Sequence, residues 1–172
     1  LCATRTTETL KATWKEIDLD KALWVIPANR MKGRKEHKIP LSTQAVEKLR
    51  EVKQLRMSEY VFPNLSSGQH LSQAGMSSVL KRLNQNSGWQ DKQGRKISVH
   101  GFRSTFRDYI ADKTMFDGAM AEHALAHKIP DASVAAYHRT TMVEKRRIMM
   151  QTYADYALNI DSDRGRVTQI SA

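Results

Sequence analysis

Tyr137, His138 and Arg139 stand together ten residues after His127, which closes the stretch Glu122–His127. That stretch has the apolar spacing of an amphipathic run, and a histidine at the end of such a run is common in any fold. A tyrosine one segment later, beside histidine and arginine, is less common. A phenol can attack a phosphate when basic groups hold the phosphate and absorb the charge that develops. The pattern therefore indicates a nucleophile at Tyr137, served by cations from elsewhere in the chain.

Two short patterns offer such cations. His100 and Arg103 are three residues apart, so on a helix they share a face and can reach one anion, with Phe102 packing inward. A capped helix with a solvated arginine would leave the same pattern. Arg5 carries a planar fork that matches phosphate oxygens, and Glu8 can steady a neighbouring basic side chain. An ordinary ion pair on a helix surface is the alternative there.

The third basic group is the predicted turn Lys32-Gly33-Arg34-Lys35 between two strands. Such a hairpin can enter a DNA minor groove and place the Lys32 ammonium beside a leaving oxygen. Lys32, Arg34 and Lys35 are accordingly the predicted DNA contacts. A solvated run of charge, which is what most Lys-Gly turns are, remains the alternative.

His123 and His127 are four residues apart, like the histidines of zinc enzymes with a His-Glu-x-x-His motif. Ala124 occupies the position of the catalytic glutamate, so the motif fails. We therefore expect no metal and no cofactor. A metal hydrolase built on these two histidines stays open as an alternative that EDTA would test.

The composition favours a polyanionic partner. Lys and Arg number 28 against 18 Asp and Glu, a net charge of +10, which is typical of nucleic-acid-binding proteins but also of ribosomal-type scaffolds. The single cysteine, Cys2, excludes an internal disulfide and fits a reducing compartment. No apolar run reaches the roughly 20 residues of a membrane span, and nothing resembles a signal peptide. We expect a cytoplasmic protein.

The pattern predicts an α+β fold, mostly helical, with a small three-stranded antiparallel sheet near the N-terminus. Strands are expected at 14–19, 23–27 and 37–41. Helices are expected from Ser42 to Leu55, from Ser72, and over 100–113, 117–126, 131–137 and 141–158. The side chains expected to face inward include Leu55 on the first helix and Met76, Val79, Leu80 and Leu83 on the second. The last helix carries Met142, Ile148, Met149, Tyr153 and Tyr156.

Taken together, the motifs carry a resemblance. They are Arg5-x-x-Glu8, the Lys32-Gly33 hairpin ending in Ile39-Pro40-Leu41, His100-x-x-Arg103, Leu125-Ala126-His127, and Tyr137. Their types and order resemble the tyrosine recombinase (phage integrase) family, most of all prophage-type integrases, over about 1–158. Two departures are Cys2-Ala3 in place of Thr-Gly and Leu-Ala-His in place of Leu-Gly-His.

The resemblance implies the catalytic-domain fold of that family and a role for each matching residue. Arg5 and Arg103 would clamp the phosphate, Lys32 would be the hairpin lysine, and Tyr137 the nucleophile. His100 would be the first histidine, His127 would fill the histidine-or-tryptophan position, and Glu8 would be the acidic supporting residue.

The implied activity is site-specific DNA recombination, as in prophage integration or excision, through a 3′-phosphotyrosyl intermediate without metal or ATP. A type IB topoisomerase and a non-enzymatic basic DNA-binding module are the alternatives. The expected partners are double-stranded attachment sites and DNA-bending accessory proteins, in a bacterial cytoplasm at the nucleoid.

The expected organisation is a catalytic domain over 1–160 and a flexible tail over 161–172. The N-terminal DNA-binding domains of the family are missing from this stretch. We expect a homotetramer on DNA for a full-length protein and a monomer for this part alone.

Overall fold

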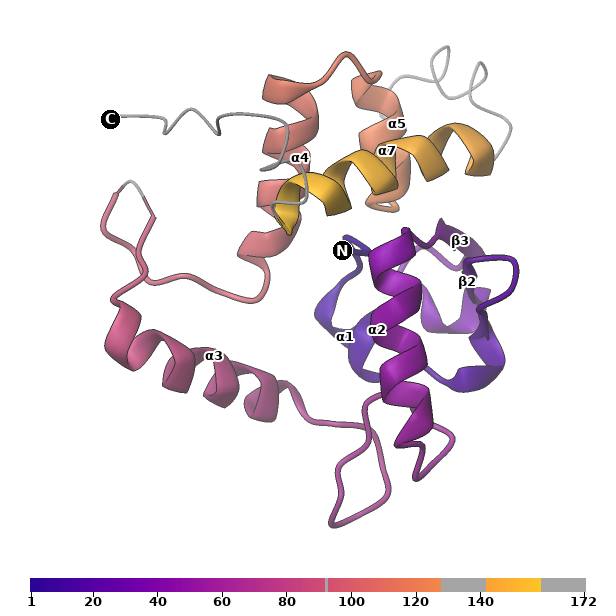
Figure 1. The fold of residues 1–172 in the computed structure, drawn as a ribbon, viewed down its shortest axis with the longest axis vertical. Helices are drawn as coiled ribbons and strands as arrows, with labels where there is room; N and C mark the ends of the chain where they lie inside the picture. The colour runs from indigo at the N-terminus through magenta and orange to yellow at the C-terminus, as the bar shows by residue number, and fades with distance from the viewer. Residues whose placement is uncertain (92, 128–141, 159–172) are drawn as a thin grey trace.

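The computed structural model describes residues 1–91, 93–127 and 142–158, and its elements confirm the predicted α+β class (Figure 1). Helices occupy about half of the chain and one small antiparallel sheet lies near the N-terminus. In chain order the elements are α1 (Thr6–Leu10), the 3₁₀ turn η1 (Trp14–Glu16), β1 (Ile17–Asp18), β2 (Leu23–Ile26), the 3₁₀ turn η2 (Ala28–Arg30), β3 (His37–Pro40), α2 (Thr43–Gln54), α3 (Gln73–Ser87), α4 (Gly101–Lys113), α5 (Gly118–Ala124) and α7 (Val143–Ala157).

The sheet has the order β1-β2-β3, with Trp24 of β2 paired to Ile17 on one side and Ile39 on the other. Trp24 and Ile26 alternate with half-buried neighbours, as a strand with one face on the core requires. The strand predicted over 14–19 is wrong in its first half. The amide of Trp14 donates to the carbonyl of Glu59, 3.0 Å away, so the chain leaves the sheet there and coils into η1.

The first hydrophobic core lies between the sheet and α2. Ser42 caps α2 by accepting the amide of Ala45 at 3.3 Å, as predicted. Leu55, expected to face inward, is 78% exposed, because α2 ends at Gln54 and Leu55 lies beyond its last turn. The buried residues of this core are Ala12, Trp14, Trp24, Ile26, Met31, Ile39, Leu41, Ala45, Val46 and Val61.

The second core is formed by α4, α5 and α7, which Figure 1 shows grouped together above the sheet. Phe106, Ile110 and Met149 are fully buried at its centre. Ile148 of α7 points outward at 64% exposure, since its neighbour Met149 takes the inner face of the helix. Tyr156 is likewise 47% exposed and stacks on Tyr109.

Arg146 of α7 joins the two cores. Its side chain is 1% exposed, its Nη2 donates to the carbonyl of Lys38 in β3, and its Nη1 lies 2.9 Å from Nδ1 of His123 in α5. Arg146 thus links α7 to both the sheet and α5, and fixes the position of the helical core relative to the sheet.

Helix α3 lies at the edge of the molecule, where it contacts α1 (Figure 1). Ser72 caps it, accepting the amide of Gly75 at 3.0 Å, which confirms the predicted start. None of its residues is buried, so the expected inward orientation of Val79 and Leu83 is wrong. Phe102 is also exposed, at 59%, because Arg103 rather than Phe102 turns into the protein.

Three of the sequence predictions lie outside the described residues. They are the helix over 131–137, the nucleophile Tyr137 and the tail over 161–172. Within the described part of the chain, no helix is long and apolar enough to span a membrane.

Candidate active site

The start of α1 fixes Arg5 in place. Arg5 is the N-cap of this helix, and Glu8 turns back so that its Oε2 accepts the Arg5 amide at 2.8 Å. The other oxygen, Oε1, pairs with Arg5 Nη1 at 2.8 Å, and the Glu8 side chain is only 4% exposed. One buried carboxylate therefore caps the helix and orients the guanidinium.

The end of α5 forms the opposite wall. The amide of His127 donates to the carbonyl of Glu122 at 3.0 Å and that of Ala126 to His123 at 3.1 Å, with Ala126 at a φ of 51°. These two bonds and the left-handed residue define a Schellman motif, which reverses the chain after the helix. The reversal presents the carbonyls of Leu125 and Ala126 and the ring of His127 on one side.

Two arginines from distant parts of the chain meet at these carbonyls. Arg5 Nη2 donates to Ala126 at 3.2 Å, and Arg103 Nη2 donates to Leu125 at 2.7 Å. Arg103 Nη1 also donates to the carbonyl of Ala3. Burial, and next the positive charge of Arg5, lower the pKa of the Arg103 guanidinium. Although Glu8 is paired with Arg5, two guanidiniums side by side suit a ligand with several anionic oxygens, such as a phosphate.

His127 completes the cluster. Its Nε2 lies 3.2 Å from Arg103 Nη2, and its Nδ1 lies 2.6 Å from Oε2 of Glu122. The His127 side chain is 39% exposed, so one edge of the ring faces solvent beside the arginines. Arg5, Glu8, Arg103 and His127, four of the predicted site residues, are thus in contact through a chain of hydrogen bonds.

The other predicted site residues make no contact with this cluster in the described part of the chain. Lys32, Arg34 and Lys35 are exposed in the turn after Met31, whose buried side chain anchors the turn to the sheet. His100 is exposed at the N-cap of α4, one turn before Arg103. Both groups are therefore accessible to a bound partner.

Sequence reasoning missed Glu122 and Arg107. Arg107 Nε donates to Glu122 Oε1 at 2.7 Å, while the other carboxylate oxygen contacts His127. Glu122 and His127 are five residues apart, which is not a helical-face spacing. Only the left-handed turn at Ala126 brings them together, and an alanine gives no signal for such a turn.

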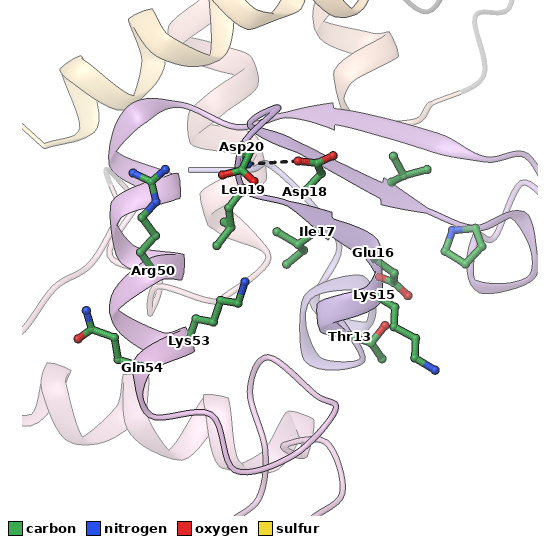
Figure 2. A pocket seen from close by; sticks show the side chains of 12 residues that line it. Thr13, Lys15, Glu16, Ile17, Asp18, Leu19, Asp20, Arg50, Lys53 and Gln54 are labelled. Atoms are coloured by element: carbon green, nitrogen blue, oxygen red, sulfur yellow. Dashed lines mark hydrogen bonds between the residues drawn. The ribbon is translucent and has the colours of Figure 1, made fainter.

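The hollow drawn in Figure 2 lies elsewhere. It has a volume of about 1160 Å³, lies between β1 and α2, and contains no predicted site residue. Its lining carries acidic groups at Glu16, Asp18 and Asp20 as well as basic ones at Lys15, Arg50 and Lys53. Mixed charge of this kind does not favour a phosphate, so the cluster around Arg103 is the better candidate site.

The two histidines proposed for a metal do not share a site. His123 faces Arg146, whereas His127 faces Glu122 and Arg103. Guanidinium groups beside both rings oppose binding of a cation there.

Comparison with known structures gives the fold. The chain superimposes on the crystal structure of XerA recombinase with a TM-score of 0.61 at 18% identity, over 84% of this chain and 52% of that one. The integrase of transposon Tn1549, in complex with circular intermediate DNA, gives a TM-score of 0.57 at 15% identity over 86% and 53%. The fold is that of tyrosine recombinases.

Comparison of sequences gives the family. The phage integrase family matches residues 1–144, and the chain belongs to that family. It is 33% identical over 173 residues to prophage integrase IntA of Escherichia coli K12, covering 99% of this chain and 40% of that protein. The integrase of enterobacteria phage P4 is 33% identical over 88% of this chain and 37% of its own length. The chain thus spans about 40% of the length of these relatives.

Proposed function

We propose that this chain is the catalytic part of a site-specific recombinase that cuts and rejoins DNA through a phosphotyrosine at Tyr137. The observation that supports this most is the meeting of Arg5, Arg103 and His127 at the end of α5, where Arg5 contacts Ala126 across a separation of 121 residues and Arg103 contacts His127. All six proposed catalytic residues lie within the stretch that matches the phage integrase family. The relatives include prophage integrases, and the Tn1549 neighbour was solved on DNA.

In the proposed reaction the phenolic oxygen of Tyr137 attacks a DNA phosphorus, and the bond from phosphorus to the 5′-oxygen breaks. Arg5 and Arg103 hold the non-bridging oxygens and stabilise the charge of the pentavalent transition state. Loss of one such donor typically costs about 10²–10³ in rate. Because the guanidiniums supply this charge, the step needs no metal ion.

Proton transfers fall to the accessible residues. The phenol has an ordinary pKa near 10, so it must lose its proton as it attacks, and His100 accepts that proton. Lys32 donates a proton to the departing 5′-oxygen, and His127 hydrogen-bonds the phosphate. The 3′-phosphotyrosyl bond keeps the energy of the broken one, so a 5′-hydroxyl of a second strand can reverse the step without ATP.

The proposed partners follow from this reaction. They are double-stranded attachment sites, DNA-bending accessory proteins and three further copies of the protein around the DNA. Lys32, Arg34 and Lys35 contact the DNA backbone, and the place of action is the nucleoid of a bacterial cell.

The test is an adduct assay on nicked duplexes of random sequence in EDTA. A nick beside the cleaved phosphate lets the short leaving strand diffuse away, which traps the covalent product. We expect an SDS-resistant adduct with the unmodified chain and none with Tyr137→Phe, while both bind DNA equally. Tyr60→Phe is the matched control, since Tyr60 packs edge-on against His70 outside the cluster.

Each other result selects another function. An adduct that survives Tyr137→Phe places the nucleophile elsewhere. DNA binding without an adduct leaves a non-enzymatic module, and cleavage that requires a divalent ion leaves a metal hydrolase. Relaxation of supercoiled plasmid without strand exchange identifies a topoisomerase.

A further inference from the structure

Glu122 lies where it decides which nitrogen of His127 carries the proton. Arg103 Nη2 is 3.2 Å from His127 Nε2, and a guanidinium donates hydrogen bonds but accepts none. Nε2 must therefore present its lone pair to Arg103. The ring proton is then on Nδ1, which donates to Glu122 Oε2 at 2.6 Å.

The Glu122 carboxylate is itself held from a second side. Arg107 Nε donates to its Oε1 at 2.7 Å, so each carboxylate oxygen has its own donor. Burial acts to raise the pKa of Glu122, but the hydrogen bonds from Arg107 and His127 outweigh it and hold that pKa below its usual value. The group is ionised and fixed in orientation at neutral pH. Glu122 precedes the turn that carries His127, and its carbonyl accepts the His127 amide at 3.0 Å, so the two residues are joined through backbone as well as side chain.

With its lone pair on Arg103, the His127 ring cannot donate from Nε2 to an anion. When a phosphate oxygen occupies the space beside Arg103, Nε2 must gain a proton to hydrogen-bond that oxygen. The charged groups around the ring are Glu122, Arg103 and, through Ala126, Arg5. Of these only Glu122 stabilises an imidazolium, because the two guanidiniums repel it.

We propose that Glu122 is a positioning residue that keeps His127 in the Nδ1–H form in the free protein and stabilises its doubly protonated form when phosphate binds. The inference rests on the proposed function, for which His127 is a phosphate ligand. Binding of DNA would then be linked to uptake of one proton at this ring. Arg107 would act only through Glu122, by fixing its carboxylate.

The first measurement is NMR of ¹⁵N-labelled histidine in the unmodified chain, alone and with inorganic phosphate or a short duplex. We expect the Nδ1–H tautomer at His127 in the free protein and protonation of both nitrogens with either anion. Glu122→Gln keeps an acceptor but removes the charge, so it should retain the tautomer and lose the second protonation. The Nε2–H tautomer in the free protein would overturn the proposal.

The second measurement is the rate of adduct formation against pH. Glu122→Gln should slow the adduct about ten- to a hundredfold at neutral pH, as expected for loss of a bond to a charged group. Because the imidazolium is the required form, the variant's rate should approach that of the unmodified chain as the pH is lowered, even though protonation of His100 slows both. Glu122→Asp keeps the charge and should restore part of the rate. A merely structural role would lower the rate equally at every pH.

Glu51→Gln is the matched control, since Glu51 pairs with Lys48 on the exposed face of α2 at 3.0 Å. It should change neither readout. An adduct rate and pH profile unaffected by Glu122→Gln would contradict the role of Glu122 while leaving the proposed function intact. Absence of an adduct from the unmodified chain would contradict the proposed function, and the NMR result would then decide the proton linkage separately.

Discussion

The guanidinium of Arg103 donates to the carbonyl of Ala3, 100 positions earlier in the chain, where Ala3 has a φ of 50°. Ala126, whose carbonyl accepts from Arg5, has a φ of 51°. Each of the two arginines is thus held by the carbonyl of an alanine in the left-handed region. This conformation costs an L-residue about 1–2 kcal/mol, and glycine adopts it freely. The two departures from the family's glycines are therefore strained supports of the same site.

Glycine at either position should stabilise the protein. We expect Ala3→Gly and Ala126→Gly each to raise the free energy of unfolding by about 1 kcal/mol, since relief of strain exceeds the added entropy of the unfolded chain. Urea denaturation followed by circular dichroism measures this. Ala111→Gly, at an exposed position inside α4, should lower it by about 1 kcal/mol. Equal losses at all three positions would show that the left-handed turns carry no strain.

Glu8 should be needed for stability as well as for the orientation of Arg5. Its carboxylate is buried and makes both bonds at the start of α1. Glu8→Ala should therefore lower the free energy of unfolding by about 2–3 kcal/mol, through the lost cap and the unpaired amide. Glu51→Ala, which removes a carboxylate 61% exposed on α2, should cost under about 0.5 kcal/mol. Similar losses for both variants would refute the supporting role of Glu8.

Acid should destabilise the protein through His37. Burial, and next the charge of Arg146, lower the pKa of this ring from 6.5 to about 4; His123 and Glu8 also face it. Between pH 6.5 and about pH 4, His37 is protonated in the unfolded chain but neutral in the folded protein. The stability present above pH 6.5 is thus lost as the pH falls toward 4, by about 2 kcal/mol at pH 5.

His37→Gln provides the test, because a glutamine amide can still donate to the carbonyl of Ala124 that His37 contacts at 3.1 Å. Unfolding is measured at pH 7.5 and at pH 5 for both proteins. The variant should lose about 2 kcal/mol less than the unmodified protein between these two pH values. An identical loss in both would assign the acid sensitivity to other groups.

The basic turn should contribute to DNA affinity through counterion release. Arg34→Ala and Lys35→Ala should each reduce the slope of log K against log salt by about 0.9, the value for one phosphate contact. Lys113→Ala, at the end of α4, should leave the slope unchanged. Lys32→Ala should additionally slow the adduct by more than its effect on binding explains. Fluorescence anisotropy over a salt series measures the slopes, and an unchanged slope in the turn variants would remove the turn from the interface.

Much of the fold followed from hydrophobic period and capping chemistry. Ser42 and Ser72 begin helices where predicted, and the β-forming residues of Leu23–Ile26 correctly predicted the central strand. Period alone could not show which apolar faces are covered. The apolar residues Val79 and Leu83 of α3 stand at helical spacing, yet no element in the described part of the chain buries them.

The candidate site was predictable in its residue types but not in its supports. Arg5 and Arg103 could be picked out because arginine forks suit phosphate. The carbonyls that accept their hydrogen bonds lie at backbone turns around Ala3 and Ala126. Both alanines are left-handed, and an alanine in the sequence does not predict a left-handed turn. The role of Glu122 could not be predicted for the same reason, since its contact with His127 depends on the turn at Ala126 and not on a helical spacing.

The most direct test of the account is the identity of the residue that carries DNA in the covalent adduct. After the adduct is digested with nuclease and trypsin, mass spectrometry locates the attached nucleotide. We predict attachment through phosphorus to the phenolic oxygen of Tyr137, and loss of the product in Arg5→Ala and Arg103→Ala. Attachment at Tyr109, Tyr153 or any residue other than Tyr137 would contradict it.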